Sequence, residues 1–542
     1  MKKLLIVLLI ISLSLLTACN KNTERDLDFT FQKAFRRVEL YSKNIPENYR
    51  LIDYKSYARD FDELVYDASL TGSYLPLIWD DETYDSYGIA AYVGDPRYND
   101  DGAQEAVTMI ASVLSATQIG IDKSNVQGRN YVLELLAFYS ETEKVILNNP
   151  AGNSKTTSMW YMLYPAILFT QVSMLYPEEE SIREAALENI ASWYQAYLVM
   201  DNSGDPNFDV TGFDFTNMQS YTNNVWKEPD CAAGISLLLY YGYLLTGSED
   251  YLSAALSAMD YLDSFFGSPL YEAIYYFAPT LAAFYNTKHG KNYQIGSMLN
   301  EIFDGNSIPR GGWGSIIGKW GDYDVTGLMG SITDGGGYAF AMNTFLAAYA
   351  MSSLPKYDSR YASSIGKWIL NLCSNSRYFF PEYSDTNNQS GPLNSKAIDF
   401  IEATGGVVPY EGIRKSSHSK SPWIGGDPTN YGWAETDFSL YSGAHIGLLA
   451  SIIEETDVEA ILKIDLNKSD FLSTSYPTYL LYNPYPETKE VTYLINSSER
   501  VDLYDSITKK VLARNVQTST KLSIPANDSL VIVEIPVAAD IM

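Results

Sequence analysis

The chain has 542 residues, and 66 acidic residues against 38 Lys and Arg give it a formal net charge of −28. Apolar residues make up 46% of the sequence, a content that excludes an intrinsically disordered protein. The excess negative charge would repel phosphate groups, which argues against nucleic acid as a partner. With only three Cys and three His, the chain is neither a disulfide-stapled scaffold nor a His-rich zinc protein.

The N-terminus is typical of an export signal. Residues 1–19 read MKKLLIVLLIISLSLLTAC, in which two lysines precede an apolar run too short to span a membrane comfortably. The closing letters LTAC resemble the lipobox of bacterial lipoproteins, and this similarity implies that Cys19 is acylated. We therefore expect a polar tether at 20–27 and a membrane-anchored protein in the periplasm or at the cell surface. An ordinary signal peptide is the alternative.

Residues 28–456 are predicted to form one helical domain. Apolar residues recur there at helical spacing. The predicted helices cover 54–68, 102–118, 126–147, 157–176, 179–200, 230–246, 249–266, 270–288, 293–303, 334–353, 357–375 and 438–455. Short turns join several neighbours, whereas long loops rich in Gly, Asp and Trp (71–101, 201–229, 304–333 and 376–437) separate the hairpins. This alternation predicts a closed ring of about six helical hairpins, with the functional loops at one end.

Residues 457–542 show a different pattern. Short runs of alternating apolar residues, separated by turn signals, predict strands at 479–482, 490–495, 501–504, 510–512, 520–524 and 529–535. Their spacing favours a small antiparallel β-sandwich with a structural role. Cys231 and Cys373, which remain after Cys19, are expected to be buried free thiols.

Three segments carry a resemblance to a known superfamily. WKEPDCAAGI at 226–235 leads into an apolar helix and then TGSEDYL at 246–252, and SMWYMLYPA at 158–166 opens another hairpin. Together with the C-terminal strands, these segments resemble the six-hairpin glycosidase superfamily. The resemblance implies an (α/α)6 toroid followed by a β-sandwich, and a carbohydrate ligand. Because the superfamily contains hydrolases, lyases and epimerases, the reaction stays open.

Carboxyl groups are the first candidates for chemistry, since glycoside hydrolysis needs two of them across the scissile bond. Asp334, Glu228 and Asp230 lie just before predicted helices, where the helix dipole stabilises negative charge. Glu411, from the loop before the last helix, is the next candidate. Simple helix capping is the alternative for Asp230 and Asp334.

Substrate binding is assigned to aromatic and polar side chains of the long loops. Aromatic faces stack on sugar rings, and Trp residues in loops outside the helices therefore indicate a binding role. The predicted binding residues are Trp226, Trp313, Trp320, Tyr323, Asp322, Asp324, Arg414, His418, Trp423, Trp433 and Glu435. Packing of Gly-rich loops is the alternative. His445 lies within an apolar segment and is interpreted as a core or pocket-wall residue, with a catalytic base as the alternative.

The leading hypothesis is an exported lipoprotein glycoside hydrolase that acts on a neutral glycan or oligosaccharide. A polysaccharide lyase is one alternative, because His418 and Arg414 could act with a Tyr at a uronate. A noncatalytic glycan-binding lipoprotein is another. The oligomeric state is not predicted.

No cofactor is expected. Asp201, Asp205 and Asp209 alternate as calcium ligands do, but Pro206 replaces the required Gly and Gly212 stands where a Glu is needed. A calcium site there is therefore only a minor alternative.

Overall fold

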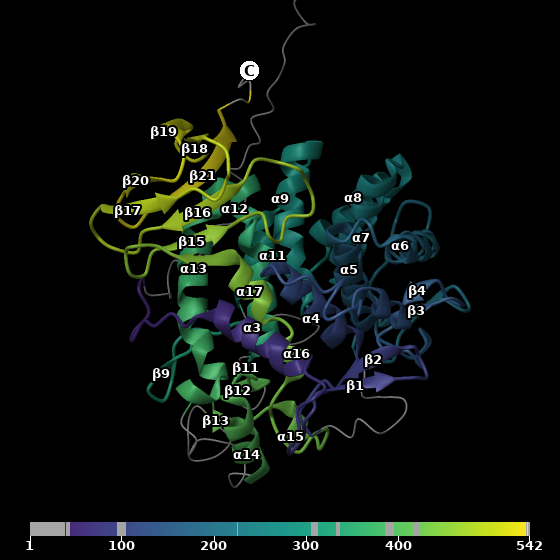
Figure 1. The fold of residues 1–542 in the computed structure, drawn as a ribbon. Helices are drawn as coiled ribbons and strands as arrows, with labels where there is room; N and C mark the ends of the chain where they lie inside the picture. Colours follow the sequence, from purple (N-terminus) through teal and green to yellow (C-terminus); the bar gives the residue numbers. More distant parts are fainter. Residues whose placement is uncertain are drawn as a thin grey trace, which may run out of the picture.

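The computed structural model describes residues 38, 44–94, 105–224, 226–304, 313–331, 337–384, 395–415, 423–537 and 539. Helices dominate as far as α17, and antiparallel strands follow at the yellow end of the chain (Figure 1). The prediction of a helical domain followed by a β-domain is confirmed. No helix among these described residues is long and apolar enough to cross a membrane.

Burial divides the helices into two layers. An inner set is buried around almost its whole circumference: α4 (Ala106–Gln118), α5 (Met159–Leu175), α7 (Cys231–Thr246), η3 with α9 (Ile274–Phe277 and Ala278–His289), α11 (Ala341–Ser352), and α16 with α17 (Leu440–Gly443 and Ile446–Ile452). An outer set buries one face: α3 (Tyr54–Val65), α6 (Glu180–Met200), α8 (Glu249–Ser264) and α10 (Ile295–Asp304). Helices that are apolar all round belong inside, and amphipathic ones cover them.

The inner helices form a closed ring. In chain order, α4 contacts α5, α5 contacts α7, α7 contacts η3, and η3 contacts α11. Helix α17 then contacts α11 on one side and α4 on the other, so the last inner helix meets the first. Helix α3 packs over this closing seam, against both α17 and α4. The fold is thus the predicted (α/α)6 toroid.

The C-terminal strands form two antiparallel sheets. Six strands are ordered β14-β15-β16-β21-β18-β19, and two more pair as β17-β20. The strands are β14 (Ile453–Glu455), β15 (Leu462–Asp465), β16 (Thr478–Tyr482), β17 (Lys489–Leu494), β18 (Val501–Asp505), β19 (Lys510–Val516), β20 (Ser519–Ile524) and β21 (Ser529–Pro536). All six predicted strands are present, and β14 and β15 were not predicted.

Alternating side chains of β16 give the larger sheet two packed faces. Tyr479 and Leu481 join a hydrophobic cluster with β17 and β20, whereas Leu480 and Tyr482 belong to the core of the toroid. Successive side chains of a strand point to opposite faces, so one strand serves both cores. On the side that faces the toroid, β16 and β21 pack against α13 (Ala362–Asn375). Helix α13 follows the short α12 (Leu354–Tyr357) in the chain.

The helix predicted at 126–147 is wrong. The segment contains a short 3-10 helix, η2 (Leu133–Phe138), and a hairpin of β3 (Tyr139–Ser140) and β4 (Val145–Ile146). The side-chain oxygen of Asn130 caps the start of η2, where it accepts the backbone N–H groups of Val132 and Leu133. Lys144 has a positive φ of 55°, which a helix does not allow. The helix predicted at 438–455 is likewise broken into α16, α17 and β14.

The long loops contain more structure than their sequence indicates. Strands from the 304–333 and 376–437 regions form a sheet ordered β13-β12-β11-β10-β7, together with β11, which replaces the start of the helix predicted at 334–353. These strands are β7 (Trp313–Ser315), β10 (Met329–Ser331), β11 (Tyr338–Phe340), β12 (Gly412–Arg414) and β13 (Trp423–Ile424). The same loops hold the hairpin β8–β9 (Lys319–Trp320 and Tyr323–Asp324) and helices α14 (Ser395–Thr404) and α15 (Asp427–Asn430). Hairpins β1–β2 (Ile78–Asp81 and Ser86–Ile89) and β5–β6 (Gly212–Asp214 and Gln219–Tyr221) occupy the other two loops.

Candidate functional site

The inner helices begin at the same end of the ring, which we call the mouth. Hydrogen bonds tie their first residues to one another and to the long loops. The backbone N–H of Trp160, in the first turn of α5, donates to the Glu228 carboxylate before α7 (2.8 Å). The N–H of Tyr271, before η3, donates to Asp230 (3.0 Å), and Ala341 N–H of α11 donates to the Glu411 carbonyl (2.8 Å). Helix N-termini gathered in this way favour carboxylates at the mouth.

Glu228 is fully buried, and both its oxygens accept hydrogen bonds. Oε2 takes the Trp160 N–H, and Oε1 takes the indole N–H of Trp226 at 2.9 Å. Burial raises the pKa of Glu228 to about 8, and the nearby charge of Asp230 adds to the effect. Glu228 thus fixes the ring of Trp226, which is 36% exposed and stacks on Tyr271 with centroids 6.1 Å apart.

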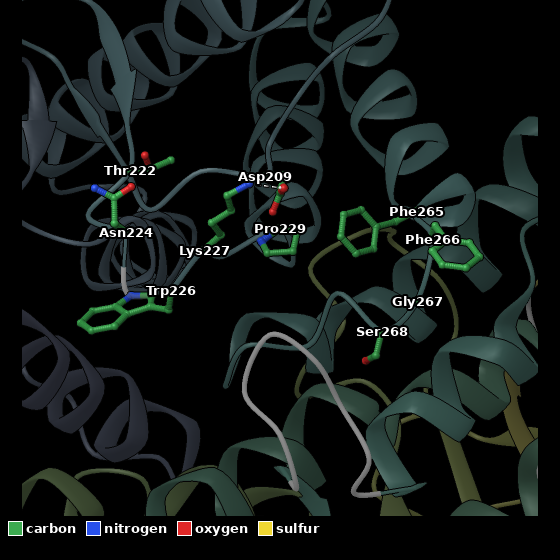
Figure 2. A pocket seen from close by; sticks show the side chains of 10 residues that line it. All are labelled: Asp209, Thr222, Asn224, Trp226, Lys227, Pro229, Phe265, Phe266, Gly267 and Ser268. Atoms are coloured by element: carbon green, nitrogen blue, oxygen red, sulfur yellow. Dashed lines mark hydrogen bonds and ion pairs between the residues drawn. The ribbon is translucent and has the colours of Figure 1, made fainter.

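Two pockets meet at Trp226. The apolar pocket, of about 570 Å³, lies between Trp226 with Lys227 and the loop after α8 that carries Phe265 and Phe266 (Figure 2). Phe266 is 99% exposed. The polar pocket, of about 490 Å³, lies between the 147–158 loop and hairpin β5–β6, and its wall includes many Asn, Thr and Ser side chains. Trp226 is therefore a shared wall between an apolar and a polar cavity.

Asp230 is also buried, and one of its oxygens holds the segment that leads into η3. Oδ2 accepts the backbone N–H groups of Tyr271 (3.0 Å) and Glu272 (3.3 Å). Burial raises the pKa of Asp230 to about 7, and the charge of Glu272 also raises it. Asp230 thereby positions Glu272, a buried carboxyl group that the sequence reasoning had not singled out.

Tyr441, in α16, stacks on Phe340 with centroids 6.2 Å apart, and its ring centroid is 6.4 Å from that of Tyr92. Burial raises its pKa well above the usual value, and the charges of Tyr161, Glu105, Tyr92 and Glu272 raise it further. Charges from four different parts of the chain therefore act on one phenol. Glu105 precedes α4 and is partly exposed.

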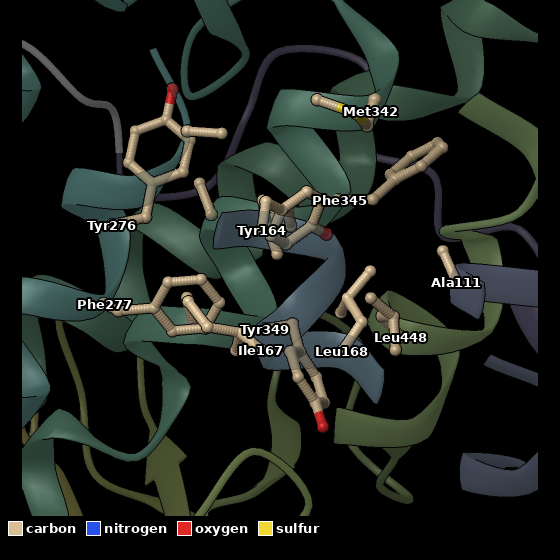
Figure 3. Close-up of a cluster of buried hydrophobic side chains, with 14 of the residues drawn as sticks. Ala111, Tyr164, Ile167, Leu168, Tyr276, Phe277, Met342, Phe345, Tyr349 and Leu448 are labelled. Carbon is tan, nitrogen blue, oxygen red and sulfur yellow. The ribbon is translucent and has the colours of Figure 1, made fainter. Parts of the chain in front are cut away.

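The ring axis below the mouth is filled. Side chains of α5, η3, α11 and α17 meet there, among them Tyr164, Phe277 and Leu448 (Figure 3). His445 lies in the same region, where its Nε2 pairs with the Tyr164 hydroxyl (2.8 Å) and its Nδ1 with the Tyr441 carbonyl (2.8 Å). Burial lowers the pKa of His445 to about 4, so the imidazole is neutral. Its interpretation as a core residue is confirmed.

Glu411 lies at the start of β12, on the other side of the mouth. Its Oε2 accepts the Tyr338 hydroxyl (2.6 Å) and the backbone N–H of Asp427 (2.7 Å). Burial raises the pKa of Glu411 to about 8, and the charge of Asp427 contributes. Arg414 forms an ion pair with Asp427 and lies over the Tyr338 ring at 4.3 Å. The sheet that sequence analysis missed thus places Glu411 and Arg414 together.

Exposed aromatic rings lie on the same side of the mouth as Glu411. Trp433 is 50% exposed and Tyr431 61%, and their rings stack with centroids 5.3 Å apart. Trp433 also stacks on Tyr92 at 6.3 Å, and burial together with the charge of Glu411 raises the pKa of Tyr92 well above its usual value. Glu435 is at the rim, where its carboxylate pairs with Lys396 (2.5 Å) and Tyr74.

Other predicted binding residues lie in packed surroundings. Trp313 is 1% exposed and donates its indole N–H to the Tyr276 hydroxyl (3.2 Å), and Trp320 is 5% exposed. Their burial assigns both to packing, because neither offers a ring face to a ligand. Tyr323 packs edge-on against Tyr378 at 4.8 Å. Buried Asp324 accepts the Thr326 N–H, whereas Asp322 is exposed in the same hairpin.

Several predictions fall outside the described residues. Asp334, His418 and Cys19 are in this group, and Trp423 is described only as a backbone position in β13. The acidic loop at 201–209 is described. Asp209 pairs with Lys227 (2.6 Å) and Asp201 accepts the Gly204 N–H (2.9 Å). Within the described part of the chain, no three His, Cys, Asp or Glu side chains, Asp205 included, form a group that could hold a metal ion. Cys231 and Cys373 are buried free thiols, as predicted.

Glu105 and Glu272 are the residues that sequence reasoning missed. Each stands just before an inner helix, as Asp230 does, so the same signal of an acid before an apolar helical segment marks both. The predicted helix at 102–118 enclosed Glu105 and the one at 270–288 enclosed Glu272, which concealed them.

No family model and no curated protein matches the chain. Among solved structures, a family 76 glycoside hydrolase from a bovine Bacteroides thetaiotaomicron strain is 10% identical, with 74% of this chain and 77% of that chain covered and a TM-score of 0.39. Endoglucanase CelQ from Clostridium thermocellum, complexed with cellobiose and cellotriose, is 11% identical over 91% and 94%, with a TM-score of 0.40. A GH127 β-L-arabinofuranosidase from Geobacillus stearothermophilus T6 is 13% identical over 90% and 81%, with a TM-score of 0.35. These names describe the three neighbours, and likeness of this degree does not extend to activity.

Proposed function

We propose that the protein is an exported lipoprotein glycoside hydrolase that cleaves a glycan or oligosaccharide by carboxyl acid and base catalysis. One observation supports this most: carboxyl groups with raised pKa and exposed aromatic rings share the mouth of the toroid. Aromatic rings provide stacking surfaces for sugars, and a carboxyl group that keeps its proton at neutral pH can protonate a leaving glycosidic oxygen.

Glu411 is the proposed general acid. With a pKa of about 8 it is mostly protonated at pH 7, and it lies beside the aromatic rim formed by Tyr92 and Trp433. The proton moves to the glycosidic oxygen as the bond to the anomeric carbon breaks. A second, ionised carboxyl group then activates water or attacks the anomeric carbon. Glu105 and Glu272 at the mouth, with Asp334 from the sequence prediction, are the candidates for this second role.

Replacement of Glu411 by Gln tests the proposal. Once a glycan that releases reducing sugar has been found by screening, Glu411→Gln should lower kcat by about 100-fold or more, because an amide cannot donate the proton. For the wild type, kcat/KM should fall as the pH rises above about 8, where Glu411 loses its proton. Glu184→Gln on the exposed face of α6 is the matched control and should keep full activity.

A parallel set of variants identifies the second carboxyl group. Glu105→Gln, Glu272→Gln, Asp334→Asn and Glu228→Gln are measured on the same glycan. The proposed chemistry fails if Glu411→Gln and all of these keep full turnover. An unsaturated product that absorbs in the ultraviolet would indicate elimination instead of hydrolysis. Binding without any product would indicate a glycan-binding protein.

The lipid anchor at Cys19 is proposed from the lipobox-like motif. In a bacterial host fed labelled palmitate, the wild-type protein should take up label and fractionate with membranes. Cys19→Ala should abolish both, whereas Cys373→Ala, a change at a buried thiol, should leave them intact. Label retained by Cys19→Ala would contradict the anchor.

A further inference from the structure

We propose that the polar pocket is a subsite for an uncharged pyranose unit of the glycan, next to the reacting centre but separate from it. This inference depends on the proposed glycoside hydrolase function for its substrate class. The pocket has a volume of about 490 Å³, which lies in the range of small-molecule sites. Three of its properties support a sugar ligand: fixed amide groups, an unpaired buried acceptor and a fixed aromatic ring.

The amide groups of the pocket are held in place by the loop itself. Asn149 Oδ1 accepts the Ala151 N–H (2.8 Å), and Asn153 Oδ1 accepts the Lys155 N–H (3.0 Å). In the loop after β6, Asn223 Oδ1 accepts the Trp226 N–H (3.2 Å). Each bond fixes the plane of an amide before any ligand arrives, which lowers the entropy cost of recognising sugar hydroxyl groups.

Asn148 provides an acceptor that a sugar hydroxyl would satisfy. Its side-chain oxygen is buried and has no hydrogen-bond partner among the described residues, although Asn148 lines the pocket. Its backbone carbonyl accepts the N–H of Ala106 at the start of α4, directly after Glu105. A buried unpaired acceptor is costly, so a donor from a ligand would contribute favourable binding energy.

The aromatic part of the wall connects the pocket with the reacting centre. Trp226 lines it and is held by Glu228 and by stacking on Tyr271. Tyr161 lines it as well and stacks on Trp160 with centroids 4.4 Å apart, and the backbone N–H of Trp160 donates to Glu228. A sugar in the pocket therefore lies beside the segments that carry Glu105 and Glu228, as expected for a glycan unit beyond the two that flank the scissile bond.

Charge in the pocket favours an uncharged sugar. No Asp or Glu is among the described residues that line it, and Lys155 is the single cation there. Lys155 lies near Asp214. Burial raises the pKa of Asp214, but hydrogen bonds from Asn217 and the charge of Lys155 bring it below its usual value. Because the chain as a whole carries a net charge of −28, a single exposed lysine is a weak attraction for a uronate, and an uncharged sugar is favoured.

The test compares the binding of long and short oligosaccharides. Affinities of gluco-, manno- and xylo-tetraoses and their disaccharides are measured for Glu411→Gln, with tetragalacturonate as the charged probe. Adding Asn148→Ala or Trp226→Ala should weaken binding of the preferred tetraose by about tenfold, since a hydrogen bond or a stacking surface is lost. Disaccharide affinity should change less than threefold. Tyr476→Ala, on the exposed surface of the C-terminal region, is the aromatic control and should change neither.

The outcomes distinguish a failure of the proposed sugar subsite from a failure of the proposed hydrolase function. Equal tetraose affinity in folded Asn148→Ala and Trp226→Ala, in a protein that hydrolyses the glycan, overturns the subsite and leaves the proposed function intact. Loss of tetraose binding without any hydrolysis by the wild type supports the subsite and overturns the function. Preference for tetragalacturonate overturns the assignment to an uncharged sugar.

Discussion

At the scale of single residues, four acids were predicted for catalysis, and the three that the structure describes differ in what surrounds them. Glu228 and Asp230 accept backbone or indole N–H groups and thereby position Trp226 and Glu272. Glu411 is bonded to a hydroxyl and to one backbone N–H, close to the exposed rim. The sequence reveals an acid before a helix. It cannot reveal the partners, because they lie far away along the chain.

The buried carboxyl groups predict a pH-dependent stability. The pKa of Glu228 is about 8 in the folded state against an ordinary value of 4.5. Between these values the folded protein holds a proton that the unfolded chain has released, so the stabilisation present below pH 4.5 is lost as the pH rises through about 8. Glu228→Gln should remove this contribution, which amounts to at most about 1.4 kcal/mol per pH unit.

Denaturant unfolding at pH 5, 6, 7 and 8 measures the effect. The free energy of unfolding of Glu228→Gln should fall less steeply with pH than that of the wild type, whatever the cost of the substitution itself. Glu490→Gln, at an exposed position of β17, should follow the wild-type slope. Parallel curves for Glu228→Gln and wild type would show that Glu228 titrates normally.

At the scale of elements, prediction depended on length. The long inner helices are apolar over several turns, so the length of their apolar segments was sufficient to place them. Strands of two or three residues, such as β12 and β13, are too short to show a period of two, and their partners come from distant segments. The sheet that supports Glu411 was invisible for this reason.

Contact between α13 and β16 gives a test at this scale. Gly366 of α13 packs so tightly that an added Cβ would lie 2.5 Å from the Cβ of Tyr482, an atom that cannot rotate away. Gly366→Ala should therefore destabilise the protein by about 1–3 kcal/mol, even though Ala favours helices over Gly.

Thermal and denaturant unfolding measure this change. Ser253→Ala on the exposed face of α8 is the control and should be neutral or slightly stabilising. A Gly366→Ala variant as stable as the wild type would mean that the strand and the helix can separate at little cost.

At the scale of the whole molecule, the sequence was sufficient for the architecture and insufficient for the site. Hairpin count, loop lengths and the change of periodicity near residue 457 predicted a toroid followed by a β-domain. Of the tryptophans predicted to bind substrate, Trp226 and Trp433 are exposed, whereas Trp313 and Trp320 are buried. Composition cannot distinguish an exposed tryptophan from a packed one, because both kinds lie in loops outside the helices.

Closure of the ring by α17 between α11 and α4 has a consequence for folding kinetics. The contact joins segments from the two ends of the toroid sequence, and its loop-closure entropy must be overcome late, after the intervening hairpins have formed. Until then Tyr441 and Glu105 remain apart, so a nascent or C-terminally shortened chain would contain most of its helices and no assembled mouth. Activity should therefore appear in a single late step during refolding.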